Sequence, residues 1–117
     1  MELAKIVARQ MAADVERGFS EEMQTDADRL AQLTRDTVGL VGEVGEFANL
    51  LKKVELASRI DGYGIITLED ASADLREELA DAMIYIIRLS SVLHGDIEED
   101  LLRKMAKNDE RYRHLEE

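Results

Sequence analysis

Two acidic pairs are the residues of this sequence whose types and spacing could do chemistry. Glu43 and Glu46 form the pair in EVGE, and Glu78 and Asp81 form the pair in EELAD. Residues three positions apart lie on the same face of an α-helix, and a helical projection places Glu43 among apolar residues that face the core. Two such pairs on helices that pack together would bring four carboxylates into one place.

A cluster of carboxylates needs a positive partner. Like charges in a partly dry place repel each other and lose hydration, which destabilises the fold unless protons or cations compensate. Oxygen ligands without a nearby His or Cys favour Mg²⁺, Mn²⁺ or Ca²⁺ over Zn²⁺. A di-iron bundle would use Glu-x-x-His pairs, and the fourth positions here hold Glu46 and Asp81 instead. We therefore expect a divalent metal at these residues.

The C-terminal segment supplies a cationic and amide-bearing face. Lys104, Asn108 and Arg111 lie along one side of the helix expected there and overlap its apolar stripe. Cations near a helix C-terminus are often only a solvated end that the helix dipole favours, but an Asn near the centre of the stripe weakens that interpretation. In so acidic a chain, this face suits phosphate oxygens.

Three glycines, Gly39, Gly42 and Gly45, stand in the segment that carries the first acidic pair. Each costs about 1 kcal/mol relative to alanine in a helix interior. They either allow another helix or a ligand to approach closely or relieve crowding in a bundle. Their spacing and helical context do not match the G-x-G-x-x-G phosphate loop.

The elements that position these residues are predicted to be helices. Proline is absent and 45% of the residues are hydrophobic, and helix-forming residues dominate. Thr25 with Asp28, and Thr67 with Asp70, resemble capping boxes at helix starts. The sequence predicts one all-α domain, a four-to-five-helix bundle over residues 1–117, with helices at 1–19, 26–57, 70–94 and 97–114 and a loop or small hairpin at 58–69.

Composition limits the partners of the protein. The net charge of −11 argues against nucleic acid and against an anionic membrane. The N-terminal residues contain no apolar run of signal-peptide length, and no segment approaches the roughly 20 apolar residues that span a bilayer, so we expect a soluble, cytoplasmic protein. Residues 79–93 are apolar around nearly the whole helix circumference. Such a helix is usually buried on all sides, so we expect a second copy of the chain to pack against it.

In this order, the motifs resemble the MazG-like all-α nucleotide pyrophosphohydrolases. The resemblance rests on EVGE, on LREELADAMIYII, and on KMAKNDERY, which contains Lys104, Asn108, Arg111 and Tyr112. It implies hydrolysis of a nucleoside triphosphate, usually a deoxy or non-standard one, to the monophosphate and pyrophosphate, with Mg²⁺ or alternatively Mn²⁺. Nucleotide-pool housekeeping is the role that it implies. It also implies that the four acidic residues hold the metal, that the C-terminal residues bind the nucleotide, and that the chain forms a homodimer or homotetramer.

The sequence departs from the family pattern at two places. Some members carry an additional glutamate where this chain has Gly42, so Glu46, Glu77 and a metal-bound hydroxide are the alternatives for the general base. Members often place a tryptophan against the nucleobase, and Phe19 is the substitute here. Two other functions stay open from the sequence: a non-catalytic nucleotide-binding or regulatory module, and a helical assembly protein with solvated acidic strips.

Overall fold

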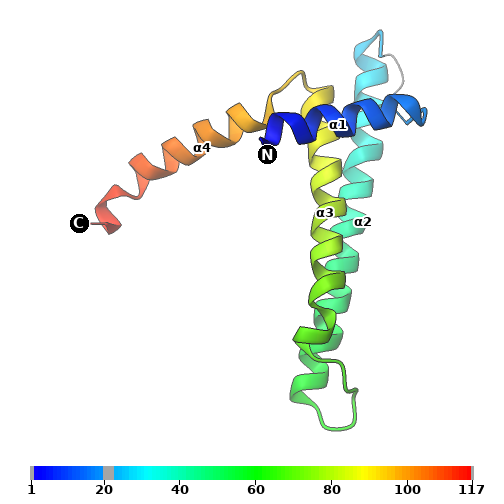
Figure 1. The fold of residues 1–117 in the computed structure, drawn as a ribbon, viewed down its shortest axis with the longest axis vertical. Coiled ribbons are helices and arrows are strands. Elements are labelled where there is room, and N and C mark those ends of the chain that lie inside the picture. Colours follow the sequence, from blue (N-terminus) through cyan, green and yellow to red (C-terminus); the bar gives the residue numbers. More distant parts are fainter. Residues whose placement is uncertain (1, 20–22, 117) are drawn as a thin grey trace.

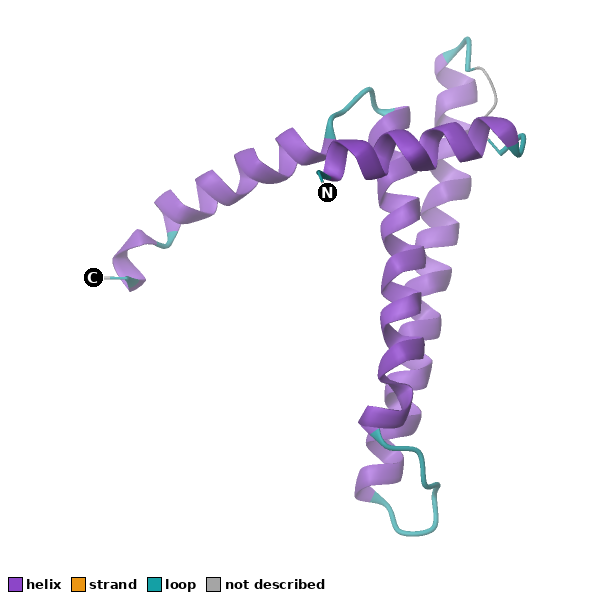
Figure 2. Ribbon diagram, in the orientation of Figure 1, coloured by secondary structure: helices purple, strands orange, loops and turns teal. Residues whose placement is uncertain are grey.

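The protein folds entirely as helices over the part of the chain that the computed structural model describes, residues 2–19 and 23–116. Figure 2 shows helices and loops and no strand in this part. The elements are α1 (Leu3–Glu16), α2 (Asp26–Arg59), α3 (Leu68–Val92), α4 (Ile97–Arg111) and a short 3-10 helix, Arg113–Leu115. The predicted all-α class is confirmed, and residues 60–67 form a loop.

Local hydrogen bonds explain where the two long helices begin. Thr25 Oγ1 accepts the backbone N–H of Asp28 at 3.1 Å, and Asp28 Oδ2 accepts that of Thr25 at 3.3 Å. Thr67 and Asp70 form the same reciprocal pair at 3.1 and 3.2 Å. These capping boxes satisfy backbone donors that a helix N-terminus leaves free. Because Thr67 is the N-cap, α3 begins at residue 68 rather than at the predicted residue 70.

An antiparallel hairpin of α2 and α3 forms the body of the molecule (Figure 1). Its best-buried cluster lies near the loop, where Val54 of α2 packs with Ala71 and Leu75 of α3. Three partly buried apolar residues complete this cluster: Phe47, Leu50 and Ile66. The hairpin fixes which face of α2 meets which face of α3, and this register positions the acidic residues described below.

The first helix crosses the hairpin at the end opposite the loop (Figure 1). Asp14 of α1 is 1% exposed and accepts two hydrogen bonds from Arg88 of α3, at 2.9 and 2.8 Å. The side-chain amide of Gln10 donates a third, at 2.9 Å. A buried carboxylate with three donors is satisfied despite its desolvation. This ion pair therefore fixes α1 on the hairpin.

The last helix, α4, extends away from the other three helices (Figure 1). The radius of gyration is 18.4 Å, whereas a compact chain of this length has about 13 Å. Leu101, Leu102 and Met105 of α4 are exposed as a consequence. One chain thus does not close the predicted bundle, because the apolar stripe of α4 has no counterpart among the described residues.

The third helix is also less covered than the sequence predicts. Ala82 and Ile87 are buried, but Leu79 and Leu93 are each more than half exposed. Among the described residues, α3 packs mainly against α2 and to a smaller extent against α1, so part of its apolar circumference stays open. Within the described ranges, no helix is both long enough and apolar enough to cross a membrane.

Candidate metal centre

Three carboxylates meet between the two helices of the hairpin. Glu43 and Glu46 come from successive turns of α2, and Glu78 comes from the facing side of α3. One carboxylate oxygen from each residue lies within 4.8 Å of those of the other two. Glu43 and Glu78 are half-buried, and Glu46 is exposed at the edge of the cluster. The structure thus brings three of the four predicted metal ligands together.

The electrostatics of this cluster favour a bound cation. Glu43 Oε2 and Glu78 Oε2 are buried and have no hydrogen-bond partner in the described chain. When protonated, Glu78 can donate a hydrogen bond to Glu43 or Glu46, which raises the pKa of Glu78 to about 7, and burial and the neighbouring negative charges add to this shift. None of the ion pairs formed by described residues includes one of these three glutamates.

The chemistry of the donor set identifies the kind of cation that fits. All three residues offer carboxylate oxygens, and two of these oxygens are desolvated without a partner. Hard divalent cations such as Mg²⁺ and Mn²⁺ bind oxygen ligands of this kind. A cation would satisfy the two orphaned oxygens and offset the negative charges of the neighbouring carboxylates.

The other two predicted acidic site residues lie near the cluster on α3. Asp81 is half-buried one turn beyond Glu78, but its oxygens are not among those that meet within 4.8 Å. Glu77 is exposed and also lies outside the cluster. The role of Asp81 as a ligand, and that of Glu77 as a base, remain predictions.

The three glycines of α2 differ in their surroundings. A Cβ added at Gly39 would collide with the Tyr85 ring of α3, whereas one added at Gly42 or Gly45 would meet no atom within 4 Å. Close approach is therefore the reason for Gly39 alone within one chain. It lets Tyr85 lie against α2 one turn from Glu43.

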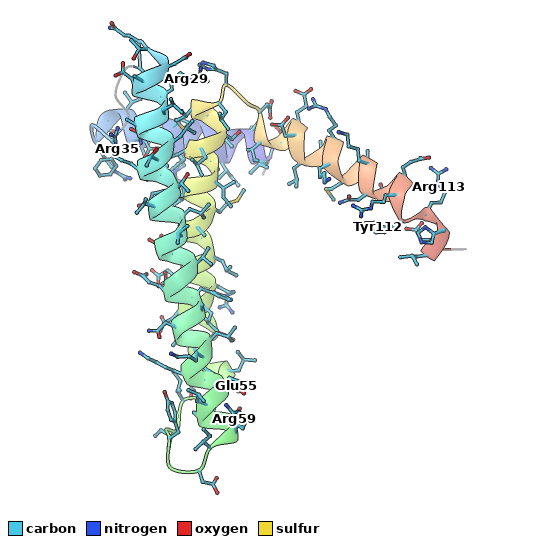
Figure 3. The ribbon with its side chains drawn as sticks, turned by 180° about the vertical axis from the view of Figure 1, so that it is seen from behind. Arg29, Arg35, Glu55, Arg59, Tyr112 and Arg113 are labelled. Atoms are coloured by element: carbon cyan, nitrogen blue, oxygen red, sulfur yellow. The ribbon has the colours of Figure 1, made fainter. Side chains whose placement is uncertain are left out.

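The predicted nucleotide-binding residues of α4 do not reach the carboxylates of their own chain. Lys104, Asn108 and Arg111 lie on α4, the helix that extends away from the hairpin, and Tyr112 follows its last residue at the far end (Figure 3). The Arg111 guanidinium lies 5.1 Å from the centre of the Tyr112 ring. Sequence reasoning grouped these residues with the metal site, and the position of α4 separates them within one chain.

Phe19 takes part in a second polar cluster that sequence reasoning did not identify. It follows α1, is 60% exposed, and has the Arg88 guanidinium 5.8 Å from the centre of its ring. Phe19 and Arg88 line the same cavities as Asp36, a buried residue of α2. The available signal was Asp36 itself, because it lies seven residues before Glu43 on the same helix face.

The comparisons with known proteins identify the family of this chain. Residues 32–116 match the family of MazG nucleotide pyrophosphohydrolase domains, so the resemblance drawn from the sequence is confirmed. The chain is 43% identical over 68 residues to the Gene 37 protein of Mycobacterium phage L5, covering 58% of this chain and 55% of that protein. It is 31% identical over 100 residues to dCTP pyrophosphatase 1 of Mus musculus, covering 85% and 57% of the two chains.

The rat dCTP pyrophosphatase 1 matches with the same identity and coverage as the mouse protein. The chain spans little more than half the length of these curated relatives. No solved structure matches the chain.

Proposed function

Because this chain belongs to the family of MazG nucleotide pyrophosphohydrolase domains, we propose that it hydrolyses a nucleoside triphosphate to the monophosphate and pyrophosphate with the help of Mg²⁺. The observation that carries this proposal is the glutamate cluster between α2 and α3. Two buried oxygens of this cluster form no hydrogen bond in the described chain. Carboxylate oxygens of this kind are the ligands of the hard divalent cations that bind phosphates.

The residues of the cluster have distinct roles in this proposal. Glu43, Glu46 and Glu78 would hold the cation, with Asp81 as a fourth ligand. When bound, a divalent cation neutralises phosphate oxygens and lowers the pKa of water. Glu46, the exposed member of the cluster, would accept a proton from the attacking water, with Glu77 or a metal-bound hydroxide as the alternative base. The phosphorus that is attacked must lie within reach of this edge of the cluster.

Assembly with further copies of the chain is part of the proposed function. The apolar residues Leu101, Leu102 and Met105 of α4 are exposed, as is Leu79 of α3. Packing α4 on the hairpin of another copy would bury these residues. It would also let Lys104, Asn108 and Arg111 approach the phosphates and Tyr112 the nucleoside. We therefore propose a homo-oligomer, either a dimer or a tetramer.

The names of two relatives suggest where to begin with substrates. The mouse and rat proteins are dCTP pyrophosphatases, so deoxycytidine triphosphate belongs in the first panel together with the other canonical deoxynucleotides and modified ones. The proposed biological role is housekeeping of the nucleotide pool.

Pyrophosphate release tests the proposal directly. We expect turnover of at least one triphosphate with Mg²⁺ or Mn²⁺, no turnover with EDTA, and loss of turnover in Glu43→Ala. Glu55→Ala is the matched control, because Glu55 is an exposed α2 glutamate paired only with Arg59. Release that persists in Glu43→Ala, or its absence for every triphosphate and metal, would overturn the proposal. Metal-dependent triphosphate binding without release would identify a non-catalytic nucleotide-binding module.

A further inference from the structure

A second buried carboxylate lies two helical turns from the glutamate cluster. Asp36 of α2 is 5% exposed. Its Oδ1 accepts a hydrogen bond from Gln32 Nε2 at 3.0 Å, and no described residue donates to its Oδ2. Asp36 Oδ2 is not among the buried oxygens that lack a partner, so this oxygen still reaches solvent. It is therefore free to accept an N–H group from a ligand.

The neighbours of Asp36 hold it in place without neutralising it. Gln32 donates to Asp36 through its amide nitrogen and accepts from Arg35 Nη2 at 2.9 Å through its carbonyl oxygen. Arg88 makes its two short hydrogen bonds to Asp14 instead, and no ion pair in the described chain includes Asp36. The site thus holds two arginines that donate to other residues, Arg35 and Arg88, and one carboxylate that can accept further N–H groups.

This acceptor faces a cleft with aromatic walls. The cleft has a volume of about 360 Å³ and is lined by Gly18, Phe19, Gln32, Arg35, Asp36, Tyr85 and Arg88. The Arg88 guanidinium lies 5.8 Å from the Phe19 ring centre and 5.3 Å from that of Tyr85. Aromatic rings and a guanidinium plane are the surfaces on which flat bases stack. Figure 3 shows Arg35 on the part of α2 near the crossing with α1.

The helical register connects this cleft with the glutamate cluster. Asp36 precedes Glu43 by seven residues, which is two turns, about 10 Å along α2 and nearly the same direction around its axis. Tyr85 follows Glu78 by seven residues on α3 and lies against Gly39 between the two sites. A nucleotide whose phosphates lie at the glutamates could therefore place its base in the cleft, because sugar and phosphates span such a distance.

We propose that Asp36 selects nucleobases that carry an exocyclic amino group, cytosine over uracil, by accepting the amino N–H with its free oxygen. This inference rests on the proposed function for the position of the phosphates. The amino group of cytosine donates to a carboxylate, whereas the carbonyl oxygen at the same position of uracil would face it and be repelled. A site with a buried polar group rejects the analogue that leaves that group unpaired.

The test compares dCTP with dUTP, which differ in this amino and carbonyl group. We expect kcat/KM for dCTP to exceed that for dUTP by about tenfold or more, the discrimination of one good base contact. Asp36→Asn replaces one carboxylate oxygen by an amide NH₂ group, which donates instead of accepting. If the remaining oxygen still accepts from Gln32, the NH₂ group faces the base, and the ratio should fall to about one or invert. Asp61→Asn, an exposed loop carboxylate, is the control and should leave the ratio unchanged. A wild-type ratio near one, or a preference that Asp36→Asn retains, would overturn the inference.

Two further measurements keep the test decisive. If Asp36→Asn does not fold, Gln32→Met removes the amide that holds Asp36 and should lower the preference for dCTP, and an unchanged ratio would count against the inference. Calorimetric binding of dCMP and dUMP requires no turnover. Tighter binding of dCMP without pyrophosphate release would support base selection in the cleft and overturn the proposed enzymatic activity. Equal binding of dCMP and dUMP together with pyrophosphate release would support the activity and overturn base selection by Asp36.

Discussion

Asp14 and Arg88 join α1 to α3 through two hydrogen bonds of 2.9 and 2.8 Å, 74 residues apart in the sequence. The carboxylate is almost completely buried, while the guanidinium also lies against the rings of Phe19 and Tyr85. This pair determines where the N-terminal helix lies, and with it the aromatic wall of the cleft above Asp36.

Removing Arg88 should strongly destabilise the protein. Arg88→Met leaves the buried carboxylate of Asp14 with only Gln10 as a donor, and breaking a buried pair in this way costs about 3–5 kcal/mol. Arg103→Met is the control, because both ion pairs of Arg103 are exposed and each is worth up to about 1 kcal/mol. Urea unfolding at one fixed protein concentration measures both values. Equal losses would show that the buried pair contributes no more than the exposed pairs.

Alanine substitutions in α2 should separate Gly39 from the other two glycines. Gly39→Ala forces the Tyr85 ring to move, whereas Gly42→Ala and Gly45→Ala meet open space. Alanine is favoured over glycine in a helix by about 1 kcal/mol, so the latter two should be neutral or stabilising and Gly39→Ala should be the least stable. Thermal unfolding of the three variants gives this order. A large loss in Gly42→Ala would instead indicate that another copy packs closely there.

The stability of the metal-free protein should fall as the pH rises from about 4.5 to about 7 on account of Glu78. Its pKa is 4.5 in an ordinary setting and about 7 in the folded chain, so in this interval the unfolded chain loses this proton and the folded chain keeps it. The folded state then binds more protons, and the free energy of unfolding decreases with pH.

Glu78→Gln checks this sign, because the amide does not titrate. In EDTA, the difference in unfolding free energy between Glu78→Gln and the wild type should grow across this interval. A constant difference for Glu78→Gln would show that Glu43 and Glu46 do not raise the pKa of this residue.

Divalent cations should stabilise the fold through the glutamate cluster. A ligand at 100 times its dissociation constant stabilises a folded protein by about 2.7 kcal/mol. Saturating Mg²⁺ or Mn²⁺ should therefore raise Tm in the wild type but not in Glu43→Gln. Asp81→Asn should weaken the metal dependence if Asp81 is the fourth ligand, and an unchanged midpoint of the metal titration would remove it from the ligand set.

The apolar face of α4 should hold an oligomer together. We expect sedimentation of the wild type as a dimer or tetramer, and dissociation in Met105→Glu, because a buried unpaired charge opposes association. Lys107→Glu changes an exposed α4 residue outside this stripe and is the control. Dissociation should also reduce pyrophosphate release, since Lys104 and Arg111 could no longer reach the phosphates. A monomeric wild type with full activity would contradict the proposed assembly.

The helices and their starts are the part of the fold that could be predicted from the sequence. Capping boxes and helical periodicity act within a few residues, so Thr25, Thr67 and the alternation of apolar and polar positions carry their structural meaning locally. The same local rule places Glu43 with Glu46 on one face of α2. The family could be recognised from the order of these motifs, and the comparison confirms it.

The contacts between segments far apart in the sequence could not be predicted from the sequence and became known only from the tertiary structure. The sequence suggested that the acidic pairs face each other, but the packing of α2 on α3 decided that Glu78, rather than Asp81, lies within 4.8 Å of the first pair. Likewise Asp14, Asp36 and Arg88 are ordinary charged residues in the sequence. In the folded chain Asp14 and Asp36 are buried, and Arg88 is partly buried and paired with Asp14. The helix α4 extends away from the other helices of the described chain (Figure 1). Periodicity specifies which face of a helix is apolar, whereas the partner of that face is chosen by packing between elements far apart in the sequence.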